Sequence, residues 1–563
     1  MKRRALTLLL CVAPLAIGCA TQSAPAEHVS EAVFARYAND ILARNYPADG
    51  PGAAVLVARG DTIIFRAARG EADIDTHAPL QSDSVFRIGS AAKQFSAAGL
   101  LTLVEAGRVS LDDPLSMYLP DYPGGEEITI RQLLNHTSGV RDYSSLPGFV
   151  DSTIRQDMST AQIVALFRDE PPDFAPGENW AYSNSGYMLV GAVIEAVTGM
   201  PWHAYLSQAL FRPLGMTHTG YGADPRFTAR QVPGYSYEGE QIIPMRPMSM
   251  TQPHAAGAIV SNVDDLLIWN RALHEGRVLR SATYTQMITP VGEAAAPGIQ
   301  YGLGLYTDVV RHNQMLRHEG RIFGYRAALS YLPGPDITVV VLENDDDAEN
   351  GVEDATVLVR RLAAMALGDP YPEMTPVPID AAVLETAQGV YSFEDGVTRT
   401  LRVVDGQLTA QRNNGPRRVL TPIDVDDFLY DDGFNRLQLE RNAHGAISGM
   451  RFFANGDGAG VIGARTSAEL PAAPPAMQLP RAALERLVGG YANGEVALTV
   501  FLDGEMLMVQ VVDQPALGLR ATSPAEFEQD ETGASLMFSA GEAPAVELTI
   551  RQHGRETLLR RVP

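Results

Sequence analysis

Two proline-rich segments divide this chain of 563 residues and limit what each part can fold into. Prolines cluster at 370–378 and again at 471–480. Because proline fixes φ and lacks an amide hydrogen, neither segment can continue a helix or a central strand. A single hydrophobic core rarely serves more than about 250 residues. We therefore expect three folded parts, at residues 28–368, 381–467 and 481–563.

The second and third parts share a sequence pattern. Gly389-Val390-Tyr391 in one part corresponds to Gly490-Tyr491 in the other, and a Leu-Glu pair precedes each. Short, roughly alternating apolar runs follow, separated by Asp-Gly, Asn-Gly or His-Gly turns, as is typical of antiparallel strands. We therefore expect an internal repeat of two small antiparallel β-barrels, neither of which contains a catalytic cluster.

The first part mixes strands and helices. Strand-like runs occur near both of its ends, at 53–57, 62–65, 302–309, 325–332 and 337–342. Helical stretches lie between them, at 90–106, 129–136, 160–168, 185–198 and 262–274. Strands at both ends with helices between them indicate an α+β fold, an antiparallel sheet flanked by helices.

The first 18 residues predict a secretory signal peptide. A basic segment at 2–4 precedes an apolar run at 6–17 that is too short to span a bilayer. Cys19 ends a segment similar to a bacterial lipobox, in which the cysteine is lipidated after cleavage. The alternative is a plain signal peptide cut near residue 20 or 24. We expect an exported, periplasmic protein that meets a membrane only through a lipid anchor on Cys19.

The charge and histidine pattern exclude several classes of partner. The net charge of −23 at pH 7 would repel nucleic acid phosphates. The eleven histidines form neither an H-E-x-x-H run nor an H-x-x-x-H pair, so no metal site and no cofactor is expected. The acidic run at 343–347 lacks the spacing of a calcium loop, and a solvated turn is predicted there.

The choice of basic residues is unusual. Of 44 lysine and arginine residues only two are lysines, Lys2 in the predicted signal and Lys93. Arginine does not release its proton in any usable pH range, whereas a buried lysine can. A lone lysine in an arginine-using chain therefore indicates a position where deprotonation matters.

Lys93 follows Ser90 by three residues, and residues three apart share one face of a helix. A serine hydroxyl needs an adjacent base to attack a carbonyl at neutral pH, and a desolvated lysine can be that base. Ser90 is therefore the candidate nucleophile and Lys93 its candidate base. Ser138, within His136-Thr137-Ser138-Gly139, is instead predicted to cap a turn.

Two further motifs follow Ser90 along the chain. Tyr182-Ser183-Asn184 lies 92 residues on, and His318-Glu319-Gly320 lies another 136 beyond. The order S-x-x-K, Y-x-N, K/H-x-G resembles that of serine β-lactamases, penicillin-binding proteins and their relatives. Other segments are similar to blocks of the same family, at 111–114, 130–139, 176–178, 213–216, 301–304 and 324–326. The resemblance covers about residues 33–365.

The resemblance implies a role for each residue of the first two motifs. Ser90 would attack the carbonyl and form an acyl-enzyme. Lys93 and Tyr182 would carry the protons, and which of them is the resting base stays open. Asn184 would hold Lys93 and the substrate amide by hydrogen bonds.

The third motif would supply the oxyanion hole and contact the substrate. The donors would be the backbone N–H groups of Ser90 and Arg321, and Gly320 would let the substrate lie against the strand. Where many relatives carry lysine, this chain has His318, which is mostly neutral above its usual pKa of about 6.5. The carboxylate clamp for penicillins or D-Ala-D-Ala ends is thereby weakened.

Histidine at this position, together with two added barrels, resembles the layout of D-aminopeptidase with its lipocalin-like barrels. The chain is therefore expected to be a serine hydrolase that cleaves amide or peptide bonds in small-molecule or peptide substrates. Three alternatives stay open: a family C type carboxylesterase, a β-lactamase or D-Ala-D-Ala carboxypeptidase, and a catalytically decayed cell-wall-binding lipoprotein.

Overall fold

The computed structural model describes the chain from residue 29 to residue 562, apart from short segments. The predicted signal peptide and Cys19 lie outside the described residues, so secretion and lipidation stay predictions. The segments left out are 1–28, 147–152, 239–240, 297, 347–354, 372–374, 405, 414–416, 431–432, 457, 471–476, 478, 494–496, 505, 512–515, 530–531, 533, 540–543, 553–554 and 563. Among the helices of the described ranges, none is both long enough and apolar enough to cross a membrane.

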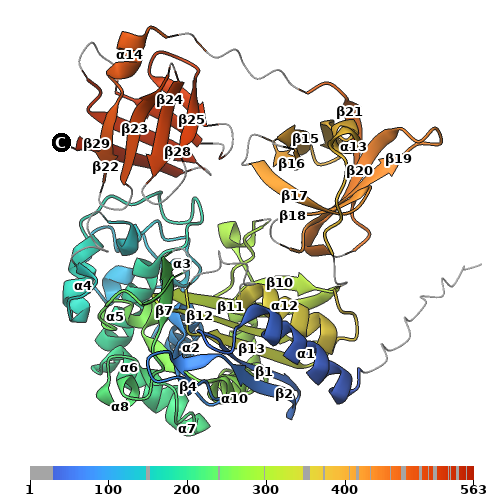
Figure 1. Ribbon diagram of the computed structural model, residues 1–563. Helices are drawn as coiled ribbons and strands as arrows, with labels where there is room; N and C mark the ends of the chain where they lie inside the picture. Colours follow the sequence, from blue (N-terminus) through green and yellow to red (C-terminus); the bar gives the residue numbers. More distant parts are fainter. Residues whose placement is uncertain are drawn as a thin grey trace, which may run out of the picture.

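The first part of the chain contains a six-stranded antiparallel sheet in the order β10-β11-β12-β13-β1-β2 (Figure 1). The strands are β1 (Ala53–Arg59), β2 (Thr62–Arg69), β10 (Tyr306–Val310), β11 (Asn313–Ile322), β12 (Tyr325–Leu332) and β13 (Ile337–Glu343). Strand β1 pairs with β13, so both ends of this part meet in the middle of the sheet. The predicted antiparallel sheet with helices is confirmed.

Helices cover both faces of this sheet. Odd-numbered residues of β1 pack in a core with α1 (Glu31–Asn45) and α12 (Ala355–Ala366). Even-numbered residues pack in a second core with α2 (Lys93–Glu105) and α10 (Val263–His274). Because successive side chains of a strand point to opposite faces, β1 must be apolar throughout, and all its residues up to Ala58 are buried.

The helices predicted between the strands are present with slightly different ends. They are α2, α3 (Ile130–Leu134), α4 (Thr160–Phe167), α5 (Asn184–Thr198) and α10. The strand predicted at 302–309 starts only at Tyr306. Gly304 has a left-handed φ of 87°, and a Cβ there would lie 3.1 Å from the carbonyl oxygen of Lys93. Residues 302–305 therefore form a turn packed against α2.

The prediction of a solvated turn at 343–347 is wrong for residues 343–345. Glu343, Asn344 and Asp345 are buried. Arg326 on β12 pairs with the carboxylates of Glu343 and Asp345, each at 2.6 Å. Paired charges can be buried where single charges cannot.

The second and third parts are closed antiparallel barrels, as predicted. The first barrel contains β14 (Gly389–Phe393), β15 (Thr398–Val404), β16 (Gln407–Arg412), β17 (Arg417–Asp424), β18 (Asp427–Tyr430), β19 (Arg436–Arg441), β20 (Ile447–Phe453) and β21 (Val461–Ser467). The second contains β22 (Gly489–Ala492), β23 (Ala497–Asp503), β24 (Met506–Val511), β25 (Leu517–Ala521), β26 (Glu526–Gln529), β27 (Ala534–Phe538), β28 (Glu547–Gln552) and β29 (Arg555–Val562). A short helix precedes each barrel, α13 (Ala381–Thr386) and α14 (Arg481–Glu485).

The two barrels repeat one arrangement at their first strand. The hydroxyls of Tyr391 and Tyr491 each donate to the backbone carbonyl oxygen four residues earlier, at 2.7 Å in both barrels. A guanidinium from the last strand lies over each ring, Arg465 at 5.9 Å and Arg561 at 5.7 Å from the centroid. The repeat in sequence therefore corresponds to a repeat in structure, and Tyr391 and Tyr491 occupy equivalent positions.

Candidate active site

The predicted nucleophile and base lie on one turn at the start of α2. Ser90 belongs to a 3-10 helix, η1 (Gly89–Ala92), that continues directly into α2 at Lys93. The Nζ atom of Lys93 lies 3.1 Å from the Oγ atom of Ser90. The i, i+3 spacing therefore brings the amine within hydrogen-bond distance of the hydroxyl.

Lys93 is completely buried, with 0% of its surface exposed. Its Nζ atom also contacts the Oδ1 atom of Asn184 at 2.8 Å and the carbonyl oxygen of Ala256 at 3.0 Å. None of its oxygen partners in the described chain is a carboxylate. Burial lowers the pKa of Lys93 to about 7, although the charge of Asp142 acts in the opposite direction. Near pH 7 this lysine is therefore about half neutral.

Asn184 is held by Asp142, a residue that the sequence analysis did not identify. The carboxylate of Asp142 accepts from the backbone N–H of Asn184 at 2.6 Å and from its side-chain amide at 3.0 Å. These two bonds leave the Oδ1 atom of Asn184 directed at Lys93. Asp142 follows the family-like block at 130–139, but a single aspartate in a loop carries no signal of its own.

Tyr182 lies over the amine of Lys93, whose Nζ atom is 4.6 Å from the ring centroid. A hydrogen bond joins the Tyr182 hydroxyl to Ser90. Burial raises the pKa of Tyr182 well above its usual value of 10. Of the two groups beside Ser90, only Lys93 loses its proton near neutral pH.

Tyr182 belongs to a cluster of aromatic rings around His136. The ring of His136 lies 4.4 Å from that of Tyr182 and 4.7 Å from that of Tyr301. Its Nδ1 atom accepts from the backbone N–H of Ser183 at 3.1 Å, and burial lowers its pKa well below 6.5. Two residues later, the Oγ atom of Ser138 accepts from the N–H of residue 140 at 3.3 Å. Ser138 therefore caps a turn, as predicted.

His318 lies on β11 and is 2% exposed. Its Nδ1 atom is 2.6 Å from the carbonyl oxygen of Glu319, which can only accept, so Nδ1 carries a proton. Its Nε2 atom lies 3.1 Å from the hydroxyl of Tyr301. Burial and the nearby charge of Lys93 lower the pKa of His318 well below 6.5. His318 is therefore a neutral imidazole whose Nε2 accepts from Tyr301.

Gly320 lets β11 lie against the turn that carries Ser90. A Cβ at Gly320 would be 1.8 Å from the carbonyl oxygen of Ile88 and 3.1 Å from the backbone nitrogen of Ser90. A Cβ at Gly89 would in turn lie 3.0 Å from the backbone nitrogen of Arg321. The N–H groups of Ser90 and Arg321 thus belong to two adjoining stretches of backbone, as an oxyanion hole requires.

A cavity of about 320 Å³ opens at these residues. It is lined by Ser90, Tyr182, Tyr306, His318, Glu319, Gly320, Arg321, Arg326, Ala327 and Thr356. Lys93 and Asn184 lie behind this lining, and Tyr306 is a lining residue that the sequence analysis did not identify. The described ranges contain no group of three or more histidine, cysteine or acidic side chains that could hold a metal ion.

Sequence comparisons place the first part of the chain among known proteins. The family model for Beta-lactamase matches residues 40–364, more than half of the chain. The D-aminopeptidase of Brucella anthropi (strain ATCC 49188) is 29% identical over 338 residues, which are 59% of this chain and 62% of that protein. Penicillin-binding protein 4* of Bacillus subtilis is 27% identical over 375 residues, 63% of this chain and 82% of that protein.

Solved structures agree with these matches. The D-amino acid amidase from Ochrobactrum anthropi SV3, solved with D-phenylalanine, has a TM-score of 0.53 and 26% identity, and covers 59% of this chain and 99% of its own. The octameric penicillin-binding protein homologue from Pyrococcus abyssi has a TM-score of 0.55 over 87% of this chain and 100% of its own. Its 19% identity shows a shared fold alone. The chain belongs to the Beta-lactamase family, a family of serine hydrolases.

Proposed function

We propose that this protein cleaves amide bonds through an acyl-enzyme on Ser90, and that its substrates are amides or short peptides with an N-terminal D-amino acid. The observation that carries the substrate class is the buried, neutral His318 in the third motif. A penicillin or a D-Ala-D-Ala end presents a carboxylate, and an uncharged imidazole offers it no opposite charge. The similar D-aminopeptidase and D-amino acid amidase support the same class.

In the first step, the neutral amine of Lys93 takes the proton of Ser90 Oγ, 3.1 Å away, while Oγ bonds to the substrate carbonyl carbon. The negative charge that develops on the carbonyl oxygen is stabilised by the N–H groups of Ser90 and Arg321. Each such donor supplies about 3 kcal/mol to the transition state.

In the second step, the tetrahedral intermediate collapses and the amine leaves. Tyr182, hydrogen-bonded to Ser90 and protonated because burial raises its pKa, gives its proton to the leaving nitrogen and receives one from Lys93. The acyl group then remains on Ser90. A water molecule bonds to its carbonyl carbon and yields a proton to the same pair of residues, and this proton passes to Ser90 Oγ as the carbon–Oγ bond breaks and the acid leaves. Asn184 keeps Lys93 in place through both steps.

The test combines active-site labelling with a panel of substrates. A fluorophosphonate probe is expected to label wild type and not Ser90→Ala. Ser96→Ala is the matched control, because Ser96 is buried on the same helix and donates to the carbonyl oxygen of Ala255 at 2.6 Å. It should label like wild type. Equal labelling of wild type and Ser90→Ala would remove Ser90 from the mechanism.

The substrate class is then decided by kcat/KM for D-alanine p-nitroanilide, p-nitrophenyl acetate and nitrocefin on one preparation. We expect the D-alanine amide to be the best of the three relative to its uncatalysed rate. Activity confined to p-nitrophenyl acetate would identify an esterase instead. Turnover of nitrocefin faster than of the other two would contradict the argument from His318.

A further inference from the structure

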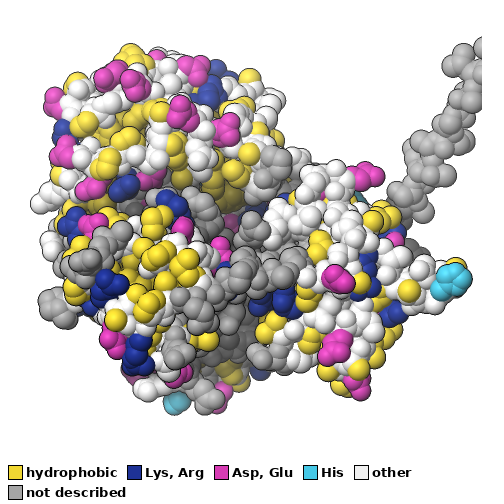
Figure 2. All heavy atoms as spheres, turned by 90° about the horizontal axis from the view of Figure 1, so that it is seen from above, with side chains coloured by type: hydrophobic (Ala, Val, Ile, Leu, Met, Phe, Trp, Pro, Cys, Tyr) yellow, Lys and Arg dark blue, Asp and Glu magenta, His cyan; other side chains and the backbone are white. Residues whose placement is uncertain are grey.

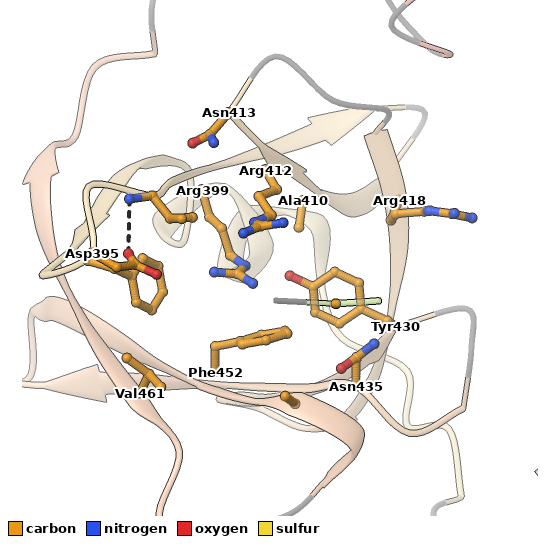
Figure 3. Close-up of a pocket in the computed structure, with 14 residues that line it drawn as sticks. Asp395, Arg399, Ala410, Arg412, Asn413, Arg418, Tyr430, Asn435, Phe452 and Val461 are labelled. Carbon is orange, nitrogen blue, oxygen red and sulfur yellow. Dashed lines mark hydrogen bonds between the residues drawn. The ribbon is translucent and has the colours of Figure 1, made fainter. Parts of the chain in front are cut away.

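The first barrel encloses a cavity of about 1060 Å³ with cationic and aromatic walls (Figure 3). The guanidinium groups of Arg399 and Arg412 extend beside each other toward the rings of Tyr430 and Phe452. Among the described residues, none lines both this cavity and the one at Ser90. Any ligand it takes therefore binds at a second site.

Arg399 is buried, and it forms no ion pair with the described residues of the barrel, although the charge of Asp395 attracts it. Only 8% of its surface is exposed, and its guanidinium lies 3.7 Å from the ring centroid of Phe452 and 4.9 Å from that of Phe393. The phenol of Tyr430 and the carboxylate of Asp395 also interact with its charge. The ion pairs among the described residues of this barrel are Arg436–Asp427, Arg441–Asp426 and Arg451–Glu440. A buried charge with rings and a phenol as its partners is costly to keep.

A second arginine stands directly opposite the first. Arg412 on β16 is the cross-strand partner of Arg399 on β15, and like charges in this position destabilise a sheet. Asp395 is the one carboxylate among the described lining residues, against Arg399, Arg412 and Arg418. Its carboxylate accepts from the backbone N–H of Val397 at 3.0 Å. The described lining therefore carries an excess of positive charge.

The second barrel shows that the fold does not need arginine at these positions. In the first barrel, Tyr391 pairs across the strands with Arg399. In the second barrel, the equivalent Tyr491 pairs with Leu498. The residue opposite that partner is Arg412 in the first barrel and Val511 in the second. Leu498 and Val511 belong to an apolar core. The same architecture is thus built with an apolar pair where the first barrel has two charges.

The positive charge of the cavity is local. The whole chain carries −23, and on the face shown in Figure 2 basic side chains are interspersed with acidic ones. An overall excess of positive charge in the protein therefore does not explain the arginine pair.

The cavity also reaches the first part of the chain, since Gly298, in the loop before β10, lines it together with the barrel residues.

We propose that the first barrel binds an organic carboxylate: the carboxylate lies between Arg399 and Arg412, and an apolar or aromatic body packs against Phe393, Tyr430 and Phe452. Paired guanidinium groups are suited to a carboxylate because they offer several N–H donors in fixed directions. The rings and the volume of the cavity call for an extended body rather than a small inorganic anion. A fatty acid and an N-acylated amino acid both have this chemistry.

The test replaces the arginine pair with the pair that the second barrel uses, Arg399→Leu with Arg412→Val. Arg441→Met is the control, because Arg441 lies on β19, outside the cavity lining, and pairs with Asp426. Isothermal titration calorimetry of the full chain compares decanoate, N-acetyl-D-phenylalanine, their neutral analogues decanol and N-acetyl-D-phenylalaninamide, and inorganic phosphate. We expect at least one carboxylate to bind wild type, with a Kd raised about tenfold or more in the double variant.

A lower Kd for decanoate than for N-acetyl-D-phenylalanine would identify the ligand as a fatty acid. A lower Kd for N-acetyl-D-phenylalanine would identify it as an N-acylated amino acid. Equal Kd values in wild type and double variant, equal binding of the neutral analogues, or no carboxylate binding at about 1 mM would overturn the proposal. We expect the double variant to unfold at no lower temperature than wild type, because it loses buried charge. If the double variant fails to fold, the same titration is made with the single variant Arg412→Val, which changes an exposed residue and should also raise the Kd of the carboxylate. Ser90→Ala should bind like wild type, which separates this site from the proposed catalysis.

Discussion

Replacing Lys93 by arginine keeps a positive charge beside Ser90 and removes the ability to give up a proton. The pKa of Lys93 is about 7, so about half of the molecules have the neutral amine at pH 7, about a tenth at pH 6 and about a hundredth at pH 5. If the neutral amine is the base, kcat/KM of wild type should fall about tenfold per pH unit below pH 7. At pH 8 the Lys93→Arg variant should be at least about a hundredfold slower than wild type, the usual effect of losing a general base.

The assay measures kcat/KM for D-alanine p-nitroanilide from pH 5 to pH 9 in wild type, Lys93→Arg and the control Ser96→Ala. Arginine is larger than lysine, and the site is fully buried, so Lys93→Met provides a check of folding at similar size. Burial lowers the pKa of Lys93 from its unfolded value near 10.5, and the unfolded chain therefore binds more protons between about pH 7 and pH 10. Across that window the stability of wild type relative to Lys93→Met should rise with pH, by about 1 kcal/mol per pH unit.

A wild-type kcat/KM that stays constant between pH 5 and pH 8 would refute the assignment of a neutral lysine as base. So would near-normal activity of Lys93→Arg, since a fixed positive charge would then suffice. Loss of activity in Ser96→Ala of the same size would mean that any change in this helix inactivates the protein.

Three further predictions concern the residues around Lys93. His318→Lys should raise kcat/KM for nitrocefin relative to D-alanine p-nitroanilide about tenfold, because it restores a cation for a substrate carboxylate; an unchanged ratio would contradict this. Gly320→Ala places a Cβ 1.8 Å from the carbonyl oxygen of Ile88, so strand β11 must move away from the turn that carries Ser90. The acylation rate should therefore fall about a hundredfold, while circular dichroism shows that the variant is folded. Asp142→Asn removes the charge that raises the pKa of Lys93, so the acid side of the pH–rate profile should move to lower pH; movement to higher pH would contradict this.

The local part of the site was predictable from the sequence, and the part that depends on distant loops was not. Ser90 and Lys93 are one helical turn apart, so their contact follows from helix geometry. Asp142 lies 42 residues before Asn184 and Ala256 lies 163 residues after Lys93. Their contacts depend on how the loops pack between helices, which periodicity does not encode.

The strand that carries the third motif was expected from the family resemblance, but the apolar pattern did not show it. Strand β11 contains Arg317, Glu319 and Arg321, which interrupt its apolar character. Arg317 and Glu319 form an ion pair, and Glu319 and Arg321 line the active-site cavity. A strand that presents polar residues to a site lacks the pattern by which buried strands are recognised, whereas β12 and β13, buried along their whole length, were predicted correctly.

The charges of two buried cations, Arg326 and Lys93, are offset in different ways, and a third buried cation, Arg399, differs from both. Arg326 shows the ordinary solution, since two carboxylates neutralise it. Lys93 has no carboxylate partner in the described chain, but with a pKa of about 7 it removes its own charge by releasing a proton. Arg399 cannot release its proton and forms no ion pair with the described residues of the barrel, so the proposed ligand carboxylate would supply the counter-charge that Asp395 provides only in part. Catalysis at Ser90 should therefore depend steeply on pH between 5 and 7, whereas binding of N-acetyl-D-phenylalanine in the barrel, whose α-carboxyl group stays ionised, should stay constant over that range and weaken with salt.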